Sequence, residues 1–339
     1  MSGSPNMSAG TEGSAAKGDP LLQIIGLTVE FPQFGAASRP ALNNVDFSIA
    51  RGEVVGLVGE SGSGKTTLAR SIMQLVPEPG YISGGRVLFE GRDLGTLGPS
   101  ELRQLRGREI SMIISNPRGE LDPLQTVGNQ IGNVLRAHTP LDGAGIRARA
   151  LELLRQVSIP APERRINAYP HELSGGMAQR VVMAIALACS PKLVVSDDAT
   201  SGLDVTVQAQ VLELMRDLVT GFGTSLLFVT RDIGITAHYC DRVAVIYAGE
   251  IVEEGPRDAF FENPRHPYSI LLLSAFAQNE RLRRYWLGDT TAGASRAREQ
   301  GCPFANRCVR VQDRCRVENP ERREFGRGHF AKCHYPVER

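Results

Sequence analysis

The sequence predicts an α/β protein with a parallel sheet at its centre, and three short apolar runs support this prediction. Residues 54–58 (VVGLV), 192–197 (KLVVSD) and 225–230 (SLLFVT) each have the composition of a strand buried on both faces. The first run leads through a glycine-rich loop into a helical segment that begins at Lys65, and residues 205–219 predict a helix between the other two. Strands that alternate with helices are typical of a parallel sheet covered by helices.

Further elements flank these strands. Residues 21–31 are rich in strand formers and residues 41–49 alternate apolar with polar side chains, so both predict strands. Residues 242–247 and 250–253 predict a hairpin around an Ala-Gly turn. Residues from about 93 to 180 have helical periodicity, many arginines and several prolines, and predict a helical subdomain.

The chain is expected to have three parts. Residues 1–19 lack the basic start and apolar core of a signal peptide, and their Gly, Ser, Ala and Pro content predicts a disordered tail. Residues 20–285 form the main domain. Residues 286–339 open with linker composition at 288–300 and continue as a cysteine-rich extension.

Charge and hydropathy exclude two classes of protein. Lys and Arg total 38 and Asp and Glu total 37, so the net charge of +1 does not favour a nucleic-acid binder. The longest apolar run, residues 181–189, is far shorter than the ~18–20 residues that cross a bilayer. In a membrane process, other chains must therefore span the membrane.

Residues 59–66 fit the phosphate-loop pattern G-x-x-x-x-G-K-[ST]. The glycines let backbone N–H groups surround phosphates at a helix N-terminus, where the helix dipole favours an anion. Lys65 would reach the β and γ phosphates, and Thr66 would hold Mg²⁺. A glycine-rich turn with an ordinary surface lysine is disfavoured, because an apolar strand precedes the loop and a helix follows it. The predicted nucleotide contacts are Gly59, Ser61, Gly62, Ser63, Gly64, Lys65, Thr66 and Thr67.

A second motif, residues 173–180 (LSGGMAQR), opens a helix that is followed by the strand ending at Asp197. In this order the motifs resemble the ATP-binding subunit of ABC transporters, and more narrowly the dipeptide/oligopeptide importer branch. The resemblance covers roughly residues 21–336. It is supported by four segments: 121–123 (LDP), 203–206 (LDVT), 266–268 (HPY) and 301–304 (GCPF).

The resemblance implies a P-loop ABC ATPase core, with a parallel sheet, an antiparallel β-subdomain, a helical subdomain and a Cys-rich C-terminal extension. Two such subunits close head to tail, so Ser174, Gly175 and Gly176 would bind the γ-phosphate of ATP held by the partner. Asp197 would hold Mg²⁺ with Thr66. Phe31 occupies the position of the aromatic ring that stacks on adenine, although a role in the strand core is almost as well supported.

Three positions depart from the pattern of the family. Asp198 replaces the catalytic Glu, Arg231 replaces the switch His, and Ser115 replaces the Gln that touches Mg²⁺ and water. These changes predict that the chain's own site binds MgATP but hydrolyses it poorly, and that it works in a heterodimer with a competent second ATP-binding subunit. The alternative is that Asp198 suffices as a base and both sites turn over.

Four cysteines, Cys302, Cys308, Cys315 and Cys333, have the spacing C-x5-C-x6-C-x17-C. Four thiolates can hold Zn²⁺ or a [4Fe–4S] cluster, and spacing alone does not separate the two. The resemblance favours the [4Fe–4S] cluster, with Zn²⁺ second and disulfides or free thiols behind both.

The predicted protein is an ABC importer subunit for peptides or similar small solutes, peripheral at the cytoplasmic face of the membrane. Its partners would be two transmembrane permease subunits, contacted through residues 121–130, and a solute-binding protein. One alternative is a soluble ABC ATPase acting on DNA or ribosomes, disfavoured because the span from Lys65 to Leu173 lacks coiled-coil heptads. The other is a regulatory or redox-sensing module that binds nucleotide without turnover.

Overall fold

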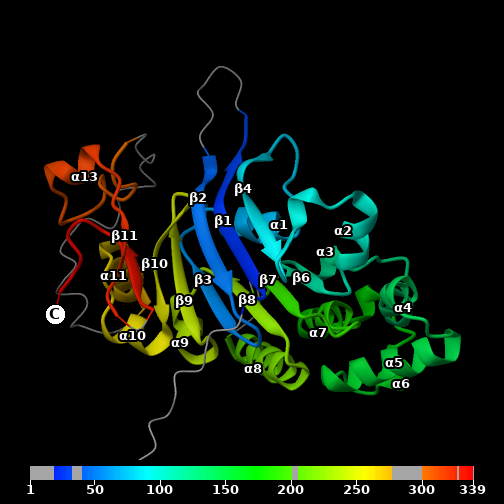
Figure 1. Cartoon of the computed structure of the whole chain (residues 1–339). Helices are drawn as coiled ribbons and strands as arrows, with labels where there is room; N and C mark the ends of the chain where they lie inside the picture. Colours follow the sequence, from blue (N-terminus) through cyan, green and yellow to red (C-terminus); the bar gives the residue numbers. More distant parts are fainter. Residues whose placement is uncertain (1–18, 33–39, 201–204, 277–299, 327, 339) are drawn as a thin grey trace, which may run out of the picture.

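The computed structural model describes residues 19–32, 40–200, 205–276, 300–326 and 328–338. Within them the chain forms two sheets, with helices packed around them (Figure 1). Most of the predicted tail and linker, and part of the 203–206 segment, lie outside the described residues.

The smaller sheet is antiparallel, with the strand order β2-β1-β4-β5. It confirms the strands predicted at residues 21–31 and 41–49, whereas β4 had no prediction. The strands are β1 (Leu22–Glu30), β2 (Pro40–Ile49), β4 (Tyr81–Phe89) and β5 (Arg92–Asp93).

The larger sheet has the order β11-β12-β10-β9-β3-β8-β7-β6. It is parallel from β9 to β6, and the three predicted central strands lie side by side as β3, β8 and β7. The predicted hairpin is confirmed as β9 and β10. The strands are β3 (Val54–Val58), β6 (Ile110–Ile114), β7 (Leu193–Asp197), β8 (Ser225–Thr230), β9 (Arg242–Tyr247), β10 (Glu250–Pro256), β11 (Arg322–Glu324) and β12 (Phe330–Lys332).

One expectation about the 93–180 segment is wrong at residues 110–114. These residues (ISMII) form β6, which pairs with β7 at the edge of the sheet. The run is only five residues long, which is too short for its period to distinguish a strand from a helix.

Helices lie on both faces of the larger sheet, and one face also carries the smaller sheet (Figure 1). They are α1 (Lys65–Ile72), α2 (Pro99–Leu105), α3 (Pro117–Glu120), α4 (Val127–His138), α5 (Gly143–Gln156), α6 (Pro162–Arg165), α7 (Gly175–Ala186), α8 (Val205–Phe222), α9 (Ile233–Tyr239), α10 (Arg257–Glu262), α11 (Pro267–Phe276) and α13 (Asp313–Val317), with 3-10 turns η1 (Leu94–Thr96) and η2 (Pro170–Glu172).

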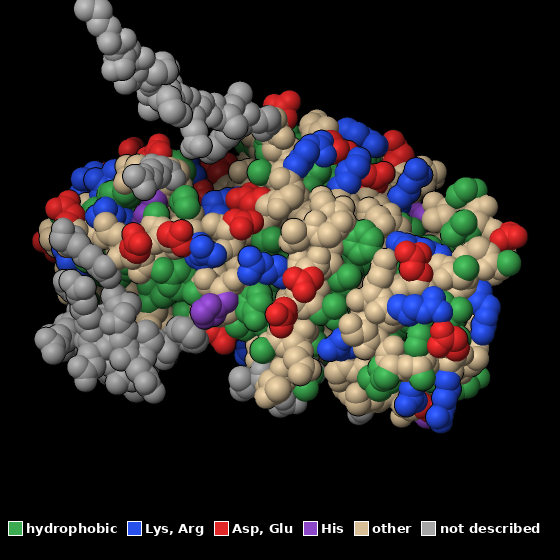
Figure 2. Space-filling model, turned by 90° about the horizontal axis from the view of Figure 1, so that it is seen from below, with side chains coloured by type: hydrophobic (Ala, Val, Ile, Leu, Met, Phe, Trp, Pro, Cys, Tyr) green, Lys and Arg blue, Asp and Glu red, His purple; other side chains and the backbone are tan. Residues whose placement is uncertain are grey.

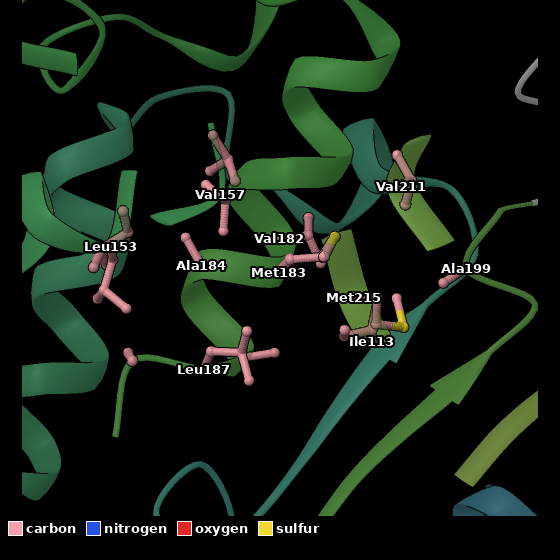
Figure 3. Close-up of a cluster of buried hydrophobic side chains, with 14 of the residues drawn as sticks. Ile113, Leu153, Val157, Val182, Met183, Ala184, Leu187, Ala199, Val211 and Met215 are labelled. Atoms are coloured by element: carbon pink, nitrogen blue, oxygen red, sulfur yellow. The ribbon is translucent and has the colours of Figure 1, made fainter. Parts of the chain in front are cut away.

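The side chains of β8 show how the layers pack, because successive residues of a strand face opposite sides of the sheet. Leu227 and Val229 lie in the core shared with the smaller sheet and α1. Leu226 and Phe228 lie in the core shared with α4, α5, α7 and α8. Figure 3 shows this second core, where Met183 of α7 packs near Met215 of α8.

The cysteine-rich extension belongs to the larger sheet. β12 pairs with β10, with Glu253 opposite Ala331, and β11 pairs with β12. A third core joins β9 and β10 to Cys302, Phe304 and Cys315. None of the helices in the described ranges is long and apolar enough to cross a membrane.

The surface in Figure 2 agrees with the near-zero net charge. On this face the Lys and Arg side chains are interspersed with Asp and Glu side chains. No strongly basic face is visible in this view.

Candidate functional site

A cavity of about 420 Å³ opens where β3 and β7 end. Both strands flank β8 in parallel register, so the loops after their carboxyl ends meet at one edge of the sheet. Such edges are where parallel α/β sheets bind ligands. The lining residues are Ala41, Ser61, Gly62, Gly64, Lys65, Thr66, Thr67, Asp197, Asp198 and Arg231. The fold therefore brings the phosphate loop together with Asp197, Asp198 and Arg231, whereas Ala41 belongs to no predicted motif.

Gly64 shapes the phosphate loop where it enters α1. Its φ is 107°, a conformation that side chains rarely adopt, and a Cβ there would approach the Ala41 carbonyl oxygen to 2.9 Å. The turn presents the start of α1 at the cavity, where unpaired helical N–H groups attract anions. Gly59 and Ser63 are buried and do not line the cavity.

Lys65 is held inside the loop. Its Nζ donates to the carbonyl oxygens of Gly59 at 2.8 Å and Glu60 at 2.7 Å. Burial lowers the pKa of Lys65, and the nearby carboxylates of Asp198 and Asp197 oppose that effect. A buried ammonium group with these partners can exchange carbonyl oxygens for phosphate oxygens, which bind a cation more strongly.

Thr66 and Asp197 form the predicted magnesium pair. The Thr66 hydroxyl donates to Asp197 Oδ1 at 3.2 Å, and Asp197 is only 5% exposed. Burial raises the pKa of Asp197, and the Thr66 hydrogen bond works against this rise. A hydroxyl and a carboxylate at a phosphate loop are the donors that hold Mg²⁺ on nucleotide phosphates, so these two residues would hold it here.

Asp198 and Arg231 contact each other at the same cavity. Arg231 Nη2 donates to Asp198 Oδ2 at 3.1 Å, and the Asp198 backbone has a left-handed φ of 51°. The carboxylate at the position predicted for the catalytic Glu is therefore paired with the guanidinium at the position predicted for the switch His. Ser115 follows β6, whose register pairs Ile114 with Asp197, but Ser115 does not line the cavity.

The signature residues lie away from this cavity. Ser174 is the N-cap of α7, and its hydroxyl accepts from the Met177 N–H at 3.3 Å. A Cβ on Gly175 would meet nothing within 4 Å, whereas one on Gly176 would approach Val207 to 3.1 Å. No described residue of this chain fills the space in front of Gly175.

Phe31 does not line the cavity. Its ring lies against Gly80, where a Cβ would come within 2.5 Å of Phe31 Cε1, and it packs on the core of the smaller sheet. The contacts of Phe31 therefore support a role in the strand core, and its stacking on adenine stays a prediction.

The four C-terminal cysteines line a second cavity of about 10 Å³, together with Phe304 and His266. Burial raises the pKa of Cys302 and of Cys333 to about 12 and also raises that of Cys308, so these thiols are neutral at pH 7. Across the described ranges, no group of three or more His, Cys, Asp or Glu side chains is arranged to hold a metal ion. The predicted [4Fe–4S] and Zn²⁺ sites are therefore not supported as preformed sites.

Comparisons with known proteins identify the class. A family model for ABC transporters matches residues 42–201, and a model for the oligopeptide/dipeptide transporter C-terminal region matches residues 252–315. A solved dimer of the ATP-binding cassette MJ0796, in a post-hydrolysis state with ADP and Pi, has a TM-score of 0.62 and 29% identity. The match covers 70% of this chain and 98% of the MJ0796 chain. The fold is therefore that of an ATP-binding cassette.

Named relatives show to which ATP-binding cassettes this chain is similar. The oligopeptide transport ATP-binding protein OppD of Bacillus subtilis is 48% identical over 256 residues, which cover 75% of this chain and 71% of OppD. The dipeptide transport ATP-binding protein DppD of Escherichia coli is 42% identical over 322 residues, which cover 94% of this chain and 97% of DppD. The chain belongs to the family of ABC transporter ATP-binding proteins that includes OppD and DppD.

Proposed function

We propose that this chain is the ATP-binding subunit of an importer for peptides or similar small solutes. The observation that carries the proposal is the cavity in which Lys65, Thr66 and Asp197 converge, in a chain whose relatives are named for oligopeptide and dipeptide transport. The subunit would sit at the cytoplasmic face of the membrane beneath two permease chains, and a solute-binding protein would deliver the cargo. Leu124, which is 86% exposed, lies in the 121–130 segment that we assign to permease contact.

The two ATP sites of the assembled transporter would differ. Lys65, Thr66 and Asp197 favour MgATP binding in this chain's own cavity, and the Arg231–Asp198 pair disfavours activation of water there. The open N-terminus of α7 at Ser174 and Gly175 would complete the partner's site in trans. The partner would be a different ATP-binding subunit with the full catalytic set.

The Arg231–Asp198 pair also favours a second candidate, a regulatory module that binds nucleotide without turnover. The two candidates differ in the assembled complex, because only a transporter subunit would support solute uptake.

The proposal also includes a metal centre in the cysteine-lined cavity. Its support is that Cys302, Cys308, Cys315 and Cys333 line one cavity and that none of the cysteines is in a disulfide. Four thiolates would supply the ligands for a [4Fe–4S] cluster or for Zn²⁺, and loading would release the thiol protons. The centre would be structural, since it would hold together segments far apart in the extension.

The decisive experiment is ATP-dependent uptake of di- and oligopeptides by the reconstituted complex. Lys65→Ala should abolish MgATP binding by this chain and lower uptake. Lys192→Ala is the control, because Lys192 forms an exposed ion pair with Glu90 away from the cavity. Uptake that is unaffected by Lys65→Ala would overturn the proposal.

A further inference from the structure

Glu60, the second residue of the phosphate loop, is bound at each of its three polar groups. Its N–H donates to the Tyr268 hydroxyl at 2.8 Å, and its carbonyl oxygen accepts from Lys65 Nζ at 2.7 Å. Its carboxylate accepts two hydrogen bonds from Arg307, at 2.7 Å and 2.9 Å. Arg307 lies 247 residues away in the sequence, in the extension. One loop residue therefore contacts both the nucleotide-binding lysine and the C-terminal region.

The guanidinium of Arg307 is fixed by its surroundings. The side chain is 8% exposed and lies over the rings of Tyr247 at 5.8 Å and Phe304 at 5.7 Å. These rings pack on each other and on Tyr268, with centroids 4.6–5.4 Å apart. A planar, two-pronged ion pair with aromatic support is a geometry that arginine provides and lysine does not.

A second ion pair in the extension, Arg314–Glu318, is a useful comparison for the Arg307–Glu60 pair. Arg314 also makes two hydrogen bonds to one carboxylate, that of Glu318. Both of those side chains are about half exposed, and exposed pairs of this kind contribute little. The Arg307–Glu60 pair is more sheltered and ends on the loop that binds phosphate.

The charge of Glu60 matters because the ligand of this loop is a polyanion. Glu60 is itself a residue of the phosphate loop, and its carboxylate acts to raise the pKa of Lys65, so its charge would also act on phosphates bound by that loop. An unpaired carboxylate here would repel the like charge of ATP. Arg307 neutralises the carboxylate and holds the loop by the same contact.

We propose that Arg307 is a positioning residue for MgATP binding, which neutralises Glu60 and fixes the phosphate loop around Lys65. The extension therefore completes the nucleotide site of its own chain. This inference rests on MgATP binding by the phosphate loop.

The test is MgATP affinity of the full chain by calorimetry, with variants chosen by charge. Arg307→Gln should weaken MgATP binding on the order of tenfold, the size expected when a charged hydrogen-bonded contact is lost. The double variant Glu60→Gln/Arg307→Gln should recover affinity to within about threefold of wild type, because the stranded carboxylate is gone. A purely structural role for Arg307 would not give this rescue.

Arg314→Gln is the matched control and should bind MgATP as wild type does. Equal melting temperatures of the ligand-free variants would show that each is folded. The inference is overturned if folded Arg307→Gln binds MgATP normally, or if Glu60→Gln fails to restore its binding. A wild-type chain that does not bind MgATP at all would instead contradict the proposed function.

Discussion

The guanidinium of Arg231 lies 3.1 Å from the carboxylate of Asp198, at the edge of the cavity that is lined by Lys65 and Asp197. A general base must be free to accept a proton from water. Here the carboxylate already accepts a hydrogen bond from a group that stays charged. We therefore propose that this site binds MgATP but hydrolyses it poorly.

We expect the purified chain to bind MgATP and to show little ATPase activity. Asp198→Glu alone should raise turnover only slightly, because Arg231 can pair with the longer carboxylate as well. Asp198→Glu combined with Arg231→His and Ser115→Gln should raise it by about 10²-fold or more, within the range of general-base catalysis. Steady-state phosphate release measures this, and brisk turnover by a homogeneous wild-type preparation would contradict it.

The N-terminus of α7 leads to a prediction about the ATP site of the partner subunit. In the assembled complex, Ser174→Arg should lower ATP turnover about 10²–10³-fold, the effect of losing one donor to the transition state. Binding of MgATP to this chain's own cavity should be unchanged, since Ser174 does not line it. Ser100→Arg on exposed α2 is the control. Normal transport by Ser174→Arg would refute the assignment.

Burial of Asp197 predicts a pH-dependent cost to stability. Because burial raises the pKa of Asp197 in the folded chain, the folded state loses stability as pH rises through that pKa. Asp197→Asn should therefore raise the melting temperature of the ligand-free protein at pH 7–8, by roughly 2–4 °C. The gain should fade toward acidic pH.

Asp122→Asn is the control for this pH series, because it should shift the melting temperature in the opposite direction. The Leu124 N–H and the Gln125 amide lower the pKa of Asp122. Its contribution to stability is present at neutral pH and is lost as pH falls, so Asp122→Asn should lower the melting temperature near pH 7. If both variants shift the melting temperature in the same direction at pH 7, the stated cause for Asp197 is wrong.

The cysteine-lined cavity predicts a spectroscopic result. Protein purified without oxygen should be brown, absorb broadly near ~400 nm and contain about four irons per chain. Cys308→Ser should remove the colour, whereas Cys189→Ser, outside the extension, should keep it. A colourless protein with one zinc would support the alternative metal, and a metal-free protein would refute the proposed centre.

The sequence by itself determined the central strands and the phosphate loop. Residues 54–58 and 225–230 are apolar on both faces, and Gly64, Lys65 and Thr66 form a contiguous motif, so local pattern was sufficient. The strand at Ile110–Ile114 escaped prediction, because five residues within a helical stretch show no usable period.

Only the tertiary structure decided which distant residues act together. The Arg231–Asp198 contact depends on the order of β8 and β7 in the sheet, and the Arg307–Glu60 contact joins residues 247 positions apart. Only the fold likewise gathers the four C-terminal cysteines at one cavity, where burial raises the pKa of the Cys302, Cys308 and Cys333 thiols. Charge pairing and desolvation depend on distances across the folded chain, and residue spacing along the sequence does not contain those distances.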